Sequence, residues 1–179
     1  MNRDRFRFFQ SVHHESDLLI GVRHRDFSRT MVKTALVEQT RLRKLLMDHI
    51  KSSPSFGTSL EPLPYPSSRE NTLDAPHLPD EILTMLRSAQ QTATGPMSSV
   101  AGLFAEKVGR RLIGAYGLDE IVVENGGDLF VKNSSDLVSV IHAGTSNLSD
   151  KMAFVITPGK WGICTSSGTI GHSFSRGKA

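Results

Sequence analysis

The stretch "DEIVVENGGDLFV", Asp119–Val131, contains two short apolar runs separated by a polar, glycine-rich tetrapeptide. Asn-Gly between two runs of strand-forming residues is a leading signal for a β-hairpin, because glycine supplies the positive φ that such turns need. A second interpretation is that Gly126 and Gly127 open the backbone to a phosphate or a ring, with Asp128 as an acceptor or metal ligand. The stretch therefore predicts a hairpin and leaves open a ligand site.

Further short segments rich in Val, Ile and Phe follow this hairpin and are separated by Gly, Asn, Ser and Pro clusters. They lie near residues 137–142, 152–157 and 161–164. An earlier apolar run at 17–22 predicts a strand or strand pair. Strands concentrated after a run of helices indicate an α+β fold, with helices packed on a largely antiparallel β-sheet.

Three helices are predicted upstream of the hairpin. Apolar residues recur at helical spacing from about Thr30 to Lys51, and Pro79-Asp80-Glu81 suits the first turn of a second helix that ends near Thr92. The third helix follows Gly95-Pro96, carries an apolar stripe from Met97 to Leu112, and reaches Gly117, where a left-handed cap is expected. Between the first two, the Pro- and Ser-rich segment 52–79 predicts an irregular surface excursion, with a lid or partner surface as alternatives.

Length and composition limit the function classes. At 179 residues the chain fits a single domain, 1–179, and a hydrophobic content of 38% is ordinary for a soluble globular protein. No stretch approaches the roughly 20 apolar residues that span a membrane, and the basic start lacks a signal-peptide run. With one cysteine there is no disulfide, so a cytoplasmic location is expected. The net charge of +3 is scattered, so nucleic acid is not an expected partner.

A second polar segment, Cys164–Ser173, is dense in hydroxyls and glycines and follows a strand. Thr165, Ser166, Ser167 and Gly168 would present small donors and amides to anionic oxygens, although many ordinary turns have the same composition. His172 could act as acid, base or donor near neutral pH. Cys164 is expected to be a buried small hydrophobe and not a nucleophile, whereas the pair His13-His14 and His142 are expected at the surface or on strands.

The segments from Thr94 to Val131 and "GICTSSGTIGHSFSRGKA" together resemble the ApbE-like proteins, most closely their uncharacterised branch labelled as thiamine-biosynthesis ApbE-related. The resemblance implies a flavin fold whose catalytic members bind FAD and, with magnesium, transfer FMN to a threonine hydroxyl, releasing AMP. Asn125, Gly126, Gly127 and Asp128 would then contact the cofactor. Thr165, Ser166, Ser167 and Gly168 would line the same site, and Asp128 and His172 would be the catalytic candidates.

Three departures from that superfamily leave enzyme activity open. Glu106 stands where catalytic members have a lysine, and an acid there would repel phosphates. His172 is followed by Ser-Phe-Ser, whereas the superfamily has an aspartate-proline-arginine pattern after its histidine. The branch continues past Ala179 into the region of the magnesium ligands, which indicates a truncated chain or missing last elements and leaves the metal ligands unassigned.

Two further function classes therefore remain beside a flavin enzyme: a non-catalytic ligand-binding or structural protein, and an enzyme for an unrelated substrate in the same pocket. Exposed sheet edges also make a homodimer an expectation.

Overall fold

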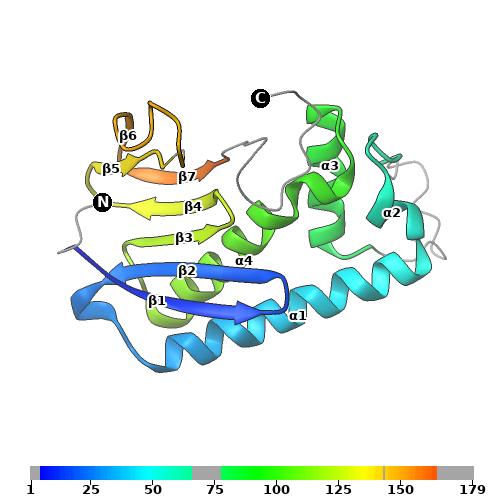
Figure 1. Cartoon of the computed structure of the whole chain (residues 1–179). Coiled ribbons are helices and arrows are strands. Elements are labelled where there is room, and N and C mark those ends of the chain that lie inside the picture. Colours follow the sequence, from blue (N-terminus) through cyan, green and yellow to red (C-terminus); the bar gives the residue numbers. More distant parts are fainter. Residues whose placement is uncertain (1–4, 66–77, 143, 165–179) are drawn as a thin grey trace.

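The computed structural model describes residues 5–65, 78–142 and 144–164. Their helices and strands follow the order β1, β2, α1, α2, α3, α4, β3, β4, β5, β6, β7, with short 3-10 turns η1 (His24–Asp26) and η3 (Pro96–Ser99) (Figure 1). The helices are α1 (Thr30–Ser52), α2 (Pro54–Thr58), α3 (Asp80–Thr92) and α4 (Val100–Tyr116). The strands are β1 (Phe6–His13), β2 (Ser16–Arg23), β3 (Ile121–Asn125), β4 (Asp128–Asn133), β5 (Leu137–Val140), β6 (Ala153–Ile156) and β7 (Gly159–Ile163).

The predicted α+β class is confirmed. Five strands form one antiparallel sheet in the order β1-β2-β3-β4-β7, and helices α1 and α4 pack on one of its faces (Figure 1). Strands β5 and β6 form a separate antiparallel pair, so the chain leaves the main sheet after β4 and returns to it at β7. Every helix in the described part of the chain is too short or too polar to cross a membrane.

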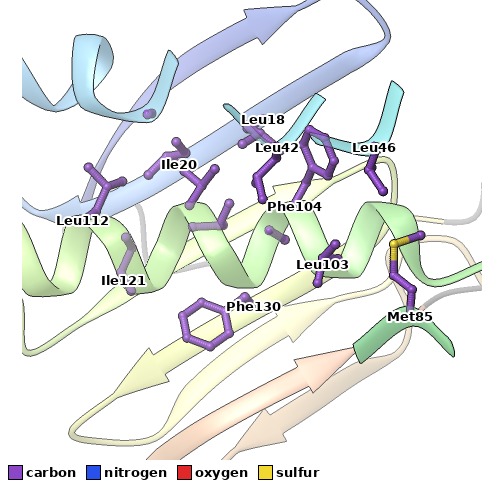
Figure 2. Close-up of a cluster of buried hydrophobic side chains, with 14 of the residues drawn as sticks. Leu18, Ile20, Leu42, Leu46, Met85, Leu103, Phe104, Leu112, Ile121 and Phe130 are labelled. Carbon is purple, nitrogen blue, oxygen red and sulfur yellow. The ribbon is translucent and has the colours of Figure 1, made fainter. Parts of the chain in front are cut away.

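The main core lies between the sheet and the helices. Figure 2 shows side chains of α1, α3, α4 and the strands meeting around α4, among them Leu42, Met85, Leu112 and Phe130. Helix α4 comes closest to the sheet at Gly109, where an added Cβ would lie 2.4 Å from Cδ1 of Phe130. A glycine is therefore required there for the helix to rest on the β3–β4 hairpin.

The opposite face of the sheet carries a smaller apolar cluster. Phe6, Val122 and Val131 of the main sheet are buried there together with Leu137 of β5 and Ile156 of β6. The β5–β6 pair therefore covers part of the face that the helices leave free, which gives three layers at this end of the molecule.

A buried carboxylate joins the N-terminal strands to the β3–β4 hairpin. Glu120, whose side chain is fully buried, accepts hydrogen bonds from Arg23 Nε at 2.8 Å and from Arg5 Nη2 at 2.5 Å. The backbone N–H of Ser134 donates to the same carboxylate at 2.9 Å. The arginine of β2 and then that of the N-terminal segment hold the pKa of Glu120 well below its usual range. This network fixes β1 and β2 to the β3–β4 hairpin.

Two details differ from the predicted elements. The segment 52–79 was predicted to be irregular, but Pro54 begins the short helix α2, whose Phe56 is buried against α1. Proline favours the first helical turn, where its missing N–H is not needed. The third helix begins at Val100 and not near Met97, because Pro96–Ser99 forms a 3-10 turn first. Its predicted cap is confirmed, with Gly117 at φ 64°.

Candidate functional site

The turn Asn125–Asp128 is a two-residue β-hairpin connection. Asn125 and Asp128 are register partners, and Gly126 and Gly127 between them have φ of 60° and 100°. Positive φ at both central positions suits the right-handed twist of paired strands and favours glycine. The carboxylate of Glu124 accepts a hydrogen bond from the Gly127 N–H at 2.8 Å. The predicted hairpin is therefore confirmed.

The side chain of Asn125 has a structural task. The residue is 9% exposed, and its Nδ2 donates a hydrogen bond to the carbonyl of Ala101 at 3.1 Å. This bond attaches the hairpin to the first turn of α4 and satisfies a buried amide. Of the tetrapeptide, Asp128 is thus the residue whose side chain is placed to meet a ligand.

Asp128 points toward the start of α4. Its carboxylate accepts a hydrogen bond from the backbone N–H of Gly102, in the first turn of the helix, and another from the thiol of Cys164. The first amides of a helix have no partner within it, so the Asp128 carboxylate lies where it can accept from the first turn of α4. Burial nevertheless raises the pKa of Asp128, because it outweighs these two bonds.

Cys164 was predicted to be a buried residue, and this is wrong: it is exposed just after β7. The physical reason is that α4 covers β3 and β4 but stops short of the last strand of the sheet. Although the residue as a whole is exposed, its thiol is partly desolvated, and this desolvation, followed by the hydrogen bond to Asp128, raises the pKa of Cys164 to about 11. The thiol is therefore protonated near neutral pH and is a donor, not an activated nucleophile.

A groove of about 390 Å3 extends from Asp128 between the helices and the last two strands of the sheet. We call it the α4–β7 groove. Its lining includes Thr84 and Ser88 of α3, Ser99, Gly102, Glu106 and Arg110 on or beside α4, Asp128 and Phe130 of β4, and Lys160, Gly162 and Cys164 on or beside β7. Directly opposed residues of an antiparallel pair share a face, so Gly162 lies on the helix side like its partner Phe130.

Two glycines leave this groove open. A Cβ added at Gly162 would meet no atom within 4 Å, and one added at Gly102 would meet only the Asp128 carboxylate, at 3.5 Å. At Gly109, by contrast, the space for a Cβ is occupied by the Phe130 ring. The second half of α4 therefore packs on the sheet, whereas the first half of α4 is separated from β7. The backbone of both walls is therefore accessible to a ligand.

Charged side chains lie toward the other end of the groove. Arg110 is two helical turns beyond Gly102 on α4, and its guanidinium lies 5.9 Å from the centre of the Phe130 ring. The Nε of Arg110 pairs with Oε1 of Glu106 at 2.6 Å. Glu106, expected to repel phosphates, is thus largely neutralised by its neighbour. Exposed Lys160 lies on β7, paired in register with Lys132.

The remaining predicted site residues lie outside the described residues. These are Thr165, Ser166, Ser167, Gly168 and His172. Cys164, which precedes them in the chain, is beside Asp128, so the two segments selected from the sequence meet at their described ends.

No group of three or more His, Cys, Asp or Glu side chains suited to a metal ion occurs within the described ranges, and the expected Mg²⁺ remains a prediction. His142 is at the surface as expected, with Nδ1 3.4 Å from an Asp150 oxygen.

Sequence reasoning missed Arg110, Lys160 and Gly162. Arg110 and Lys160 are indistinguishable in sequence from other surface cations. Gly162 did carry a signal, because glycine within an apolar strand often marks a close backbone approach.

The chain is therefore an α+β protein in which helices cover one face of an antiparallel sheet and a groove lies beside the last strand of that sheet. The whole chain, residues 1–179, matches the family described as AbpE bacteria, and the chain belongs to that family.

Its relatives include proteins named UPF0280. The protein of Methanothermobacter thermautotrophicus is 37% identical, over 76% of this chain and 50% of its own length. The protein of Methanococcus aeolicus is 35% identical, over 82% and 55%. That of Methanococcus maripaludis strain C5 is 33% identical, over 97% and 67%. The chain therefore spans about half to two thirds of the length of these relatives.

The family match corrects the resemblance stated above. AbpE is a different family from ApbE, so the assignment to the ApbE-like superfamily and its FMN transferases is wrong. The motif that suggested it has a local explanation, since Asn-Gly-Gly-Asp is the turn that a tight hairpin at this position requires.

Proposed function

We propose that the α4–β7 groove binds a small anionic cofactor or substrate, and that a flavin nucleotide, FMN or FAD, is the first candidate to test. The observation that carries the proposal is Asp128, a desolvated carboxylate at one end of a groove whose two walls are bare at Gly102 and Gly162. Perturbed carboxylates in clefts are enriched at functional sites.

The size of the groove supports a ligand of this class. Its volume of about 390 Å3 lies within the range of roughly 300–1,000 Å3 that small-molecule sites occupy. From Gly102 to Arg110 the helix rises about 12 Å, and from Lys160 to Cys164 the strand advances about 13 Å. The two walls are thus matched in length.

The polar groups divide between the two ends. Asp128 would accept hydrogen bonds from ring or ribose donors, while Lys160 would attract a phosphate at the far end and Arg110, whose charge is offset by Glu106, would donate from its remaining N–H groups. The hydroxyl of Ser88 would supply a further donor along the helical wall, whereas those of Thr84 and Ser99, which donate to the carbonyls of Asp80 and Pro96, would act as acceptors. A ligand with a donor-bearing ring at one end and an anionic group at the other therefore suits the distribution of charge.

The test is a fluorescence titration of FMN and FAD with the protein and with Gly162→Leu. Since nothing occupies the space beside Gly162, the leucine should fill the groove without disturbing the sheet. Gly114→Leu is the matched control, because Gly114 also has nothing within 4 Å but is exposed on α4 and does not line the groove. We expect saturable quenching that Gly162→Leu weakens at least tenfold and Gly114→Leu leaves unchanged.

Quenching that survives Gly162→Leu would place the flavin elsewhere, and no quenching by the unmodified protein would eliminate flavins as the ligand. Circular dichroism of both variants establishes that they fold. If FAD binds, release of AMP in the presence of Mg²⁺ separates an enzyme from a protein that only binds the nucleotide.

A further inference from the structure

Two lysines lie opposite each other on the sheet side of the α4–β7 groove. Lys132 of β4 and Lys160 of β7 are register partners. Directly opposed residues of an antiparallel pair share a face, with Cβ atoms about 4.5–5.5 Å apart. Phe130 and Gly162, which line the groove, form the register pair two residues away on the same face. The lysine pair therefore continues the sheet side of the groove beyond Gly162.

Neither lysine is paired with a carboxylate of the described residues. The ion pairs within this part of the chain involve other cations. Glu106, the acid on the helical wall of the groove, is already paired with Arg110 at 2.6 Å. Like charges directly opposite each other on paired strands are destabilising. An anion bound between the two lysines would offset this repulsion.

A lysine on the last strand of a sheet also has a simpler explanation, because such residues discourage pairing with another chain. This explanation fits Lys160, since β7 is the last strand in the sheet order. It does not fit Lys132, because β4 lies between β3 and β7 and the side chain is only partly exposed. The Nζ of Lys132 donates to the Leu118 carbonyl at 2.6 Å. An ammonium has three N–H donors, so two of them have no partner among the described residues.

We propose that Lys132 and Lys160 together bind the phosphate of a phosphate monoester, and that the ligand of the α4–β7 groove ends in such a group. A monoester carries about −1.5 to −2 charges at pH 7, which matches two lysines. The inference rests on the proposed function for the place of the rest of the ligand. A ring over Gly162 would lie about 7 Å from Lys160 along β7, so one short linker would join ring and phosphate. Among flavins this arrangement selects FMN over FAD.

The test is a calorimetric titration of the protein with phenyl phosphate, a monoester, and with diphenyl phosphate, a diester that carries a single charge. Both are titrated into the unmodified protein, Lys160→Gln and Lys132→Gln. Lys33→Gln is the matched control, since Lys33 is an exposed lysine on α1, away from the groove. We expect phenyl phosphate to bind more tightly than the diester. Each groove variant should weaken phenyl phosphate by about tenfold or more, and Lys33→Gln should leave its affinity unchanged.

Phenyl phosphate that fails to bind, or that binds Lys160→Gln as tightly as the unmodified protein, would overturn the proposal. If Lys132→Gln does not fold by circular dichroism, the exposed Lys160 variant decides alone.

Titration of riboflavin and FMN separates this inference from the proposed function. Riboflavin that binds as tightly as FMN would overturn the phosphate site but keep a flavin in the groove. Phenyl phosphate that binds through the two lysines while no flavin binds would keep the phosphate site and eliminate flavins as the ligand.

Discussion

Glu120 and Asp128 are carboxylates at opposite ends of the β3–β4 hairpin, and their pKa values are shifted in opposite directions. Glu120 is fully buried, yet two arginines and a serine satisfy it, and its pKa falls. Asp128 is less buried, its donors among the described residues are the Gly102 amide and the Cys164 thiol, and its pKa rises. Burial alone therefore does not decide which carboxylate is available to a ligand. The number and charge of the hydrogen-bond donors around the carboxylate decide it.

The two ends also differ in how the helix covers them. Over the middle of the hairpin, Gly109 of α4 packs against the ring of Phe130. After α4 the chain passes through the buried Leu118 to Glu120. Toward Asp128 the helix stands off from β7 and leaves the groove. Both ends of the hairpin are therefore attached to the rest of the fold, but only the Asp128 end borders an open groove, and matched substitutions at the two ends test this difference.

The largest effect is expected for Glu120→Gln. The amide cannot pair with the two arginines, and removal of one partner from a buried ion pair typically costs about 3–5 kcal/mol. Because Arg5 and Arg23 keep 19% and 25% exposure, we expect the lower end, about 3 kcal/mol, in urea denaturation. Glu15→Gln, at an exposed pair with Arg43, is the control and should change stability little. A loss at Glu120 no greater than at Glu15 would contradict the structural role of the network.

The same network predicts the response to acid. Since the folded pKa of Glu120 is depressed below its ordinary value of 4.5, its contribution is fully present above about pH 4.5 and is lost as pH falls toward the folded value. Urea midpoints measured from pH 6 down to pH 3 should therefore fall more steeply for the unmodified protein than for Glu120→Gln. Parallel curves would show that other carboxylates dominate acid unfolding.

Gly109→Ala should give the next largest effect. Its new Cβ would lie 2.4 Å from Phe130, so the helix or the ring must move, at about 1–3 kcal/mol. At Gly102 the same change meets one carboxylate oxygen at 3.5 Å and should be neutral, or slightly stabilising through helix propensity. Thermal melts of both variants compare the fastened and open halves of α4 directly. Equal losses at the two glycines would mean that the groove is not open beside Gly102.

The sequence predicted those features that depend on local patterns. The periodicity from Thr30 to Lys51, the acidic start of α3 at Asp80 and the cap at Gly117 each require only neighbours along the chain, and each is confirmed. The strands after the hairpin were also located correctly. The division of these strands into two sheets was not predicted. The sequences of β5 and β6 do not indicate that β4 pairs with β7 and not with β5, the next strand along the chain.

The site was predicted only as far as its turn chemistry. Glycines beside an acid identified Asp128, but the groove arises from what α4 fails to cover, and so Gly162 and Arg110 were not found. The Glu120 network could not be predicted either, because Arg5 and Arg23 are far from Glu120 in the sequence. Long-range packing decides both ends of the hairpin.

A much smaller change in stability than at Glu120 is expected for Asp128→Asn, which is the same acid-to-amide change. Its carboxylate has a raised folded pKa, so the folded state binds more protons than the unfolded one just above the ordinary pKa, and stability falls as pH rises through that interval. The asparagine removes this penalty and can still accept from the Gly102 N–H, so at pH 7 stability should match or exceed that of the unmodified protein by about 0.5 kcal/mol.

If Asp128 binds the ligand, this stable variant should still lose affinity, whereas the unstable Glu120→Gln should retain it in its folded fraction. The comparison is made by urea denaturation at pH 5 and 7 and by titration of FMN into both variants. A large destabilisation by Asp128→Asn would instead make Asp128 a structural cap of α4, equivalent to Glu120 at the other end of the hairpin. Unchanged affinity in the stable variant would move the ligand away from the Asp128 end of the groove.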